Sequence, residues 1–131
     1  MPKYMLLQSY STGAGCDVPI GEWPLADIRA HIAFQQALDD ELRDKGELVD
    51  SQGLAGPDVA KTVVSDGKGS PVVTDGPYPE GKELLAGYRL VDVESEDRAL
   101  EIAAQVSAAP GPAGAPIQHP VEVRQVMSAP A

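Results

Sequence analysis

The side chains best suited to chemistry gather in one short run of this sequence, D-G-P-Y-P-E-G-K-E, which begins at Asp75. The run holds three carboxylates, a phenol and an amine among two prolines and two glycines. In a cleft, Asp75 could exchange protons and Tyr78 could contact a ligand, while Lys82 would supply positive charge for an anionic group. Asp-Gly-Pro also favours a tight turn, and turn chemistry alone explains most of these residues.

His31 is the second candidate, because it interrupts the apolar side of a predicted helix. Imidazole is the side chain that exchanges protons most readily near neutral pH. If His31 lies across the sheet from Asp75, a carboxylate–imidazole pair would orient the ring and raise its basicity. The alternative is a core histidine whose ring nitrogens bond to nearby polar groups. The first interpretation predicts catalytic roles for Asp75 and His31.

Two aromatic residues complete the predicted ligand site. Tyr88 and Arg89 are neighbours on a predicted strand, so one side chain should face the helices and the other a dimer interface or cleft. We predict that Tyr88 helps to position the ligand, together with Tyr78 and Lys82. Trp23 precedes the first predicted helix. It would either cover the cleft as a lid or form a hydrophobic staple at the start of the helix.

Other chemical signals in the sequence are weak. Cys16 lies in a predicted loop, with no neighbouring histidine or lysine to activate its thiol. The G-A-G before it lacks the third glycine and the following helix of a dinucleotide-binding motif. His31 and His119 are the only histidines, and there is no Cys-x-x-Cys pair. We therefore expect no dedicated metal site and no cofactor.

Length and composition predict a single globular domain over residues 1–131, with 43% hydrophobic residues. Twenty acidic residues against ten basic ones give a net charge of −10, which repels nucleic-acid phosphates. No apolar run approaches the roughly 20 residues that span a bilayer, and the N-terminus lacks the pattern of a secretion signal. A single cysteine fits a reducing compartment. We predict a cytoplasmic protein with no nucleic-acid or membrane partner.

The elements that must position these residues alternate between strands and helices. Helical periodicity begins near Pro24 and ends before Gly46, the usual residue for a left-handed helix end. The D-G-K-G run suits the turn of a hairpin, and Ser95 can cap a second helix. The predicted order is strand 4–9, helix 24–45, strand 47–54, hairpin strands 61–65 and 70–74, strand 84–93, a helix after Ser95, and strand 121–127. Two βαβ units with an inserted β-hairpin predict an α+β fold, a ferredoxin-like split βαβ sandwich.

One face of the predicted sheet would stay uncovered, because both helices pack on the other. The pairs Leu6-Leu7 and Leu90-Val91 each place one aliphatic side chain on either face, since adjacent strand residues point in opposite directions. Two copies that pair their open faces would bury this apolar surface. The sequence therefore predicts a homodimer.

The run from Asp75 resembles the Asp-Gly-Pro-Phe turn of the YCII-related proteins of the DGPF type. Their Glu-x-Lys-Glu stretch resembles Glu80 to Glu83, and their Gly-Gly-Tyr strand resembles the segment that ends at Tyr88. The segments K-Y-M-L-L, E-L-R-D-K-G and S-Q-G-L also fit, so the resemblance covers Lys3 to Val126. The sequence departs from the family pattern at Tyr78, Gly81 and Ala86, where Phe, Thr and Gly are usual.

This resemblance implies a dimeric α+β barrel with a small-molecule cleft near the motif. Related folds include lyases, isomerases and cyclases, so one hypothesis is an enzyme that uses acid–base chemistry. The other is a non-catalytic ligand-binding or regulatory protein, because some DGPF-type genes lie beside genes for alternative sigma factors. A carboxylate–histidine pair in an enclosed pocket would favour the enzyme.

Overall fold

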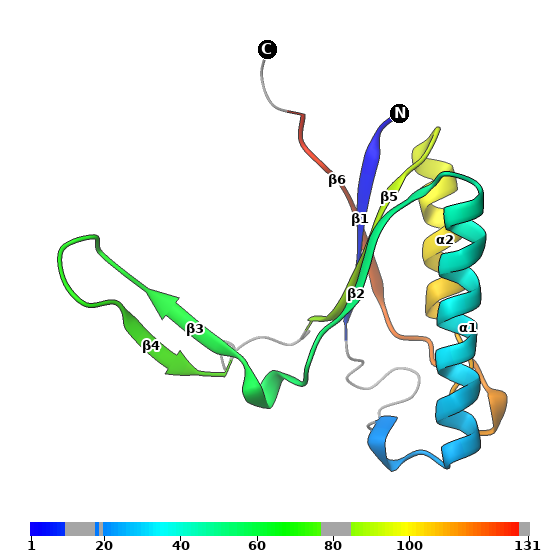
Figure 1. The fold of residues 1–131 in the computed structure, drawn as a ribbon, viewed down its shortest axis with the longest axis horizontal. Helices are drawn as coiled ribbons and strands as arrows, with labels where there is room; N and C mark the ends of the chain where they lie inside the picture. Colours follow the sequence, from blue (N-terminus) through cyan, green and yellow to red (C-terminus); the bar gives the residue numbers. More distant parts are fainter. Residues whose placement is uncertain (10–17, 19, 77–84, 129–131) are drawn as a thin grey trace.

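The computed structural model describes residues 1–9, 18, 20–76 and 85–128, and its main feature is a four-stranded sheet with the order β2-β5-β1-β6 (Figure 1). Every neighbouring pair of strands in this sheet is antiparallel. The strands are β1 (Lys3–Ser9), β2 (Leu48–Gly53), β5 (Leu85–Asp92) and β6 (Val121–Gln125). Antiparallel strands together with helices confirm the predicted α+β class. Three of the predicted residues, Cys16, Tyr78 and Lys82, lie outside the described ranges.

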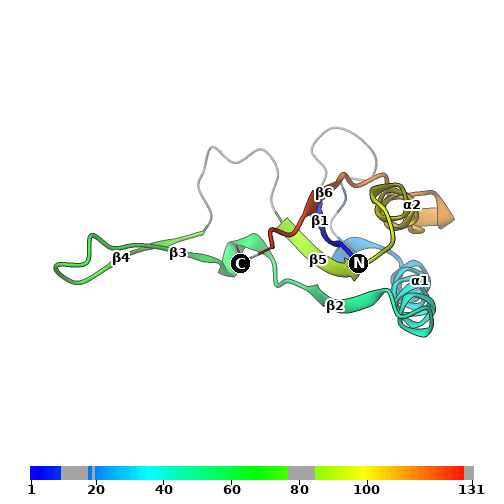
Figure 2. The ribbon, with the colours of Figure 1, turned by 90° about the horizontal axis from the view of Figure 1, so that it is seen from above.

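Two helices, α1 (Leu25–Asp44) and α2 (Glu96–Ser107), lie side by side on one face of this sheet (Figures 1 and 2). The core lies between these two layers. Its fully buried side chains come from both helices and both central strands: Leu6, Leu42, Val91, Ile102 and Val106. No described helix is long and apolar enough to cross a membrane.

The helix ends follow the predicted capping residues. Gly46 adopts the left-handed conformation, with φ of 73°, one residue beyond the C-cap of α1. The amide of Gly46 donates to the carbonyl of Arg43, and that of Glu47 donates to the carbonyl of Leu42 at 2.8 Å, which completes a Schellman motif. At the start of α2, the Ser95 hydroxyl accepts from the Arg98 amide at 3.2 Å. These caps fix where the chain leaves α1 for β2 and enters α2.

The apolar side of α1 is buried over only part of its length. Leu38 and Leu42, in the second half, are buried in the core as the periodicity predicts. Leu25 and Ile32, in the first half, are 60% and 46% exposed, so the apolar side of the helix is not buried there. In the first half, Ile28 packs against a separate small cluster of Trp23, Ala109 and Ile117 instead of the core between helices and sheet.

The strands β3 (Lys61–Val64) and β4 (Val72–Asp75) pair antiparallel as a separate two-stranded sheet. A short 3₁₀ turn, Pro57–Val59, connects β2 to this hairpin. Both views show the hairpin projecting away from the body of the molecule, on the side of the four-stranded sheet opposite the helices (Figures 1 and 2). We call this projecting hairpin, residues 61–75, the arm.

One ion pair ties α2 to the segment that enters β2. The guanidinium of Arg98 donates to both carboxylate oxygens of Glu47, from Nε at 2.9 Å and from Nη2 at 2.8 Å. The two side chains are 18% and 13% exposed, so water screens this pair poorly. The hydrogen bond from Arg98 holds the pKa of Glu47 below its ordinary value of 4.5.

We predict that Glu47→Gln lowers the free energy of unfolding by about 1–3 kcal/mol at neutral pH, because it removes a charge-assisted pair. A carboxyl with a depressed folded-state pKa stabilises the protein above its unfolded-state pKa. That contribution is lost as the pH falls through the folded-state pKa. The difference between wild type and variant should therefore shrink below about pH 4.

Urea denaturation over a range of pH measures this difference. Asp40→Asn is the matched control, because the Asp40–Arg43 pair is exposed on α1 and its loss should change stability by less than about 0.5 kcal/mol. A pH-independent effect of Glu47→Gln would contradict the assignment of the stabilisation to this ion pair.

Candidate functional site

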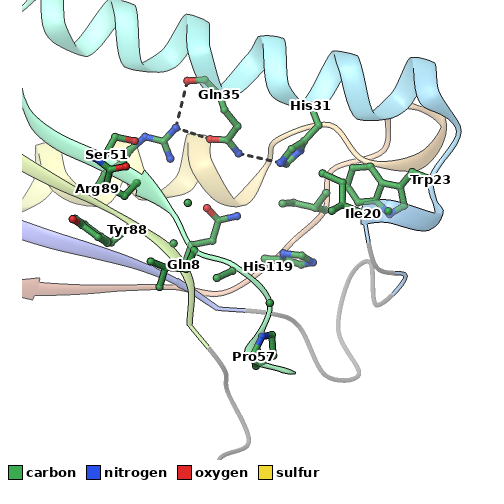
Figure 3. Close-up of a pocket in the computed structure, with 18 of the residues that line it drawn as sticks. Gln8, Ile20, Trp23, His31, Gln35, Ser51, Pro57, Tyr88, Arg89 and His119 are labelled. Atoms are coloured by element: carbon green, nitrogen blue, oxygen red, sulfur yellow. Dashed lines mark hydrogen bonds between the residues drawn. The ribbon is translucent and has the colours of Figure 1, made fainter. Parts of the chain in front are cut away.

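A cavity of about 820 Å³ lies between the first half of α1 and one end of the four-stranded sheet (Figure 3). Its volume falls within the range of small-molecule binding sites. Apolar walls come from a 3₁₀ turn at Ile20–Glu22, from Trp23 and from Ile117. The polar side chains that line it are Gln8, His31, Gln35, Asp39, Ser51, Gln52, Asp58, Tyr88, Arg89 and His119.

Arg89 forms the floor of the polar side of this cavity. It lies on β5, faces the helices and is only 5% exposed. Its Nε donates to Oδ1 of Asp39 at 2.8 Å, and its Nη2 donates to Oε1 of Gln35 at 2.5 Å. A buried guanidinium is tolerated only when it is paired in this way. Among the described residues its Nη1 has no hydrogen-bond partner, so this group remains available to a ligand.

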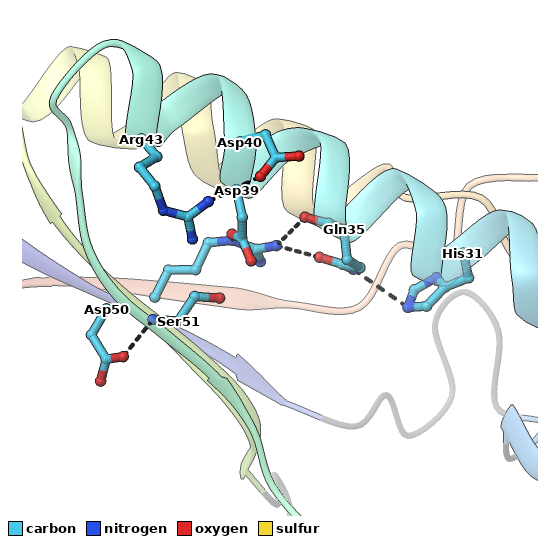
Figure 4. Close-up of polar contacts among 8 residues, drawn as sticks. His31, Gln35, Asp39, Asp40, Arg43, Asp50 and Ser51 are labelled. Atoms are coloured by element: carbon cyan, nitrogen blue, oxygen red, sulfur yellow. Dashed lines mark hydrogen bonds and ion pairs between the residues drawn. The ribbon is translucent and has the colours of Figure 1, made fainter.

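Gln35 lies between Arg89 and His31 and contacts both side chains (Figure 3). Figure 4 shows its contact with His31 along α1. Because its Oε1 accepts from Arg89, its amide nitrogen must point the other way, and it lies 3.4 Å from Nε2 of His31. On the far side of the ring, Nδ1 of His31 lies 3.0 Å from the carbonyl oxygen of Pro110. A carbonyl only accepts, so Nδ1 carries the proton and Nε2 of the neutral ring is an acceptor.

The surroundings of His31 favour its neutral form. Burial of the ring lowers its pKa below the ordinary value of 6.5, outweighing the bond to Pro110, which raises it. Electrostatic interactions with the nearby Arg89 and His119 side chains lower the pKa further. Trp23 packs edge-on against the ring, with centroids 5.4 Å apart. A neutral imidazole with an acceptor nitrogen beside a cavity is the form that can act as a general base.

Trp23 borders the cavity and also packs against the first turns of α1. It is 7% exposed and lines the cavity. It also packs in a small cluster with Ala109 and Ile117, and Ile28 lies against this cluster. Trp23 is the residue before the N-cap of α1 and Ile28 lies in its first turns, which is the arrangement of a hydrophobic staple. Its indole Nε1 donates to the carbonyl of Val18 at 2.9 Å. The ring is therefore a fixed wall rather than a mobile cover.

Asp75 lies away from this cavity, on the arm. Its carboxylate accepts from the ammonium of Lys61, and its side chain is 87% exposed. The predicted Asp75–His31 pair does not form within the chain, because Asp75 ends β4 of the projecting hairpin and its carboxylate is paired with Lys61. His31 bonds to Gln35 and Pro110 instead.

Tyr88 borders the cavity, but its hydroxyl is engaged on the other face of the sheet. It donates to Oδ2 of Asp50 on β2 at 2.8 Å. This bond raises the pKa of Tyr88 and lowers that of Asp50. The alternation of side chains along β5 explains the result, because Arg89 takes the helix-facing position and Tyr88 the opposite one.

Sequence reasoning missed Asp39, Arg89 and His119 as site residues. A signal was present, because His31, Gln35 and Asp39 follow one another at intervals of four and so lie in one line along α1. The two histidines of the chain both line the cavity, although 88 residues separate them. Within the described ranges, no group of three or more histidine, cysteine or acidic side chains is arranged to hold a metal ion.

We predict that the lowered pKa of His31 makes the protein lose stability as the pH falls below about 6.5. In that range the unfolded chain binds a proton at residue 31 and the folded chain resists it. His31→Gln lacks this proton, so wild type should lose more unfolding free energy than the variant between about pH 7.5 and about pH 5.5. Urea denaturation of both proteins measures the difference. An equal loss in the two proteins would show that the ring is not held neutral by burial.

Comparison with known proteins places the chain in a family. The family model for the YCII-related domain matches residues 3–115, which covers most of the 131 residues and includes the polar line on α1, Arg89 and the arm. No curated protein matches the chain closely enough to transfer a specific activity. The chain belongs to the YCII-related domain family.

Proposed function

We propose that this protein binds a small molecule in the cavity beneath α1 and that His31 acts there as a general base. One observation carries the proposal: a neutral imidazole, held between Pro110 and Gln35, presents Nε2 beside a cavity of about 820 Å³. The 3.4 Å contact from Gln35 is long for a hydrogen bond. A more acidic group on a ligand can replace it.

The neighbouring guanidinium suggests which proton the base removes. Nη1 of Arg89 can donate to a ligand carbonyl oxygen, and Asp39 keeps the guanidinium in place. If Nε2 of His31 takes a proton from the carbon beside that carbonyl, the electron pair moves to the oxygen, where Arg89 stabilises the developing charge. Proton transfer beside a carbonyl is a step common to isomerases, lyases and cyclases.

In this proposal Asp75 does not orient His31 or raise its basicity. Its carboxylate is paired with Lys61, outside the cavity. Asp39, Gln35 and Arg89 take over the orienting role that the sequence assigned to Asp75. The alternative function is non-catalytic ligand binding or regulation through the same cavity, in which Arg89 and the histidines only hold the ligand.

We also propose that the chain is a DGPF-type member that forms a homodimeric α+β barrel, with the arm as an insertion in a ferredoxin-like split βαβ fold. The Asp75-Gly76 motif and the strand order β2-β5-β1-β6 support this proposal. The sheet face opposite the helices also supports it, because Met5, Leu7 and Leu90 are only half-buried there. A second copy would cover these side chains.

We predict that a thermal-shift screen of small carbonyl compounds yields a ligand that also changes the fluorescence of Trp23, the only tryptophan, because this ring forms the cavity wall. In D₂O, wild type should then catalyse hydrogen–deuterium exchange at the carbon beside the ligand carbonyl. His31→Gln should slow this exchange by about 100-fold or more while the ligand still binds. Nuclear magnetic resonance of the ligand measures the exchange.

Three further variants sharpen this experiment. Gln35→Leu should slow exchange through loss of ring orientation, whereas Asp40→Asn, on the exposed side of α1, should behave as wild type. Asp75→Asn should keep the exchange, which tests the pair predicted from sequence. Binding without exchange in wild type would favour the non-catalytic alternative. A ligand whose binding is insensitive to every cavity substitution would place the site elsewhere.

A further inference from the structure

The arm exposes apolar side chains on both of its faces. Val63 pairs with Val73 across the two strands, and Val64 pairs with Val72. Successive residues on a strand point to opposite faces, so each face of the arm carries one valine pair. These four valines are 56–65% exposed. Such a surface on a projecting element is typical of a segment that packs against a partner.

The arm has little within its own chain to stabilise it. Beyond the strand ladder, its described bonds are local. At its base the Gly76 amide donates to the carbonyl of Ala60 and the Thr62 hydroxyl donates to that of Gly76, and in its turn the amides of Gly67 and Lys68 donate to Ser65 and Asp66 side chains. An isolated two-stranded hairpin is at best marginally stable in water, and three strands or packing on another element are needed. An arm built this way requires an external surface.

The same side of the molecule offers a second uncovered apolar surface. The helix-free face of the four-stranded sheet presents Met5 and Leu7 of β1 and Leu90 of β5. The arm projects on this side and points away from the sheet (Figures 1 and 2).

We propose that the arm clasps a second copy of this chain, packing its valines on the partner when the two open faces meet. The inference rests on the homodimer proposed above and adds the element that holds the dimer together. A second copy is the occupant because it brings both surfaces at once. In a twofold pair, each arm gains a partner and each open face is covered, which leaves neither surface exposed.

Docking of the arm also bears on the cavity. The segment that leads into the arm belongs to the cavity wall through Gly56, Pro57 and Asp58. A second hollow of about 350 Å³ lies at the same root and is lined by Leu54, Val59 and Leu85 among others. A partner that holds the arm therefore fixes the position of one wall of the ligand site.

The test is the dimer dissociation constant, measured by sedimentation equilibrium. Two double variants, Val63→Thr with Val73→Thr and Val64→Thr with Val72→Thr, remove apolar surface from one face of the arm each. Threonine keeps the branched shape that strands favour, and Thr62 already pairs with Thr74 in this hairpin. At least one double variant should weaken the dimer by about tenfold or more.

Two single variants complete the set. Leu100→Gln, on the exposed side of α2, is the control and should leave the dissociation constant unchanged. Leu7→Thr, on the open face, should weaken the dimer on its own. In addition, a photoreactive benzoylphenylalanine placed at Val72 should crosslink two chains on irradiation, a readout that stands even if a threonine variant folds poorly.

The outcomes distinguish the proposed role of the arm from the existence of the homodimer. A dimer weakened by Leu7→Thr but by neither arm variant, with no crosslink between chains, would overturn the role of the arm and leave the homodimer standing. A wild-type protein that stays monomeric would overturn both. Crosslinking only to other proteins in a cell extract would assign the arm to a different partner and overturn the proposal.

Discussion

The packing of α1 on the sheet depends on the buried cation of Arg89. Arg89 places a guanidinium between the sheet and α1, where water is nearly excluded, and such a charge is stable only when its donors are satisfied. Asp39 and Gln35 provide that satisfaction from one face of the helix. The requirement fixes the rotation of α1 over the sheet. It also explains why a polar line occupies positions that would otherwise complete an apolar stripe.

The two halves of α1 consequently do different work. Beyond Asp39, Leu42 packs on the sheet and supplies the hydrophobic stabilisation. Before Asp39, the helix borders the cavity, which His31 lines. His31 contacts Gln35, which in turn accepts a hydrogen bond from Arg89. Because each member orients the next, the chemistry proposed for the imidazole depends on a contact made two helical turns away. The open sheet face and the arm carry the other apolar side chains that remain exposed or half-buried.

Local rules predicted the elements well, since periodicity and capping residues depend on near neighbours along the chain. Gly46 and Ser95 end and begin helices as expected. The site was predicted only in part. His31 and Trp23 both line the cavity, but the partner of the imidazole was assigned to Asp75, because a turn rich in carboxylates is typical of a functional site. Its partners are Gln35 on α1 and Pro110 in the segment that follows α2. These residues meet only through the tertiary packing of α1, which no local pattern encodes.

The tautomer of His31 tests most directly whether Arg89, through Gln35, orients a neutral imidazole beside the cavity. Long-range ¹H–¹⁵N correlation spectra of the imidazole distinguish a proton on Nδ1 from one on Nε2 and from the doubly protonated ring. The account predicts the Nδ1–H tautomer at neutral pH, with Nε2 unprotonated, because Pro110 accepts on one side and Gln35, oriented by Arg89, donates on the other. A proton on Nε2, or an imidazolium at that pH, would contradict it.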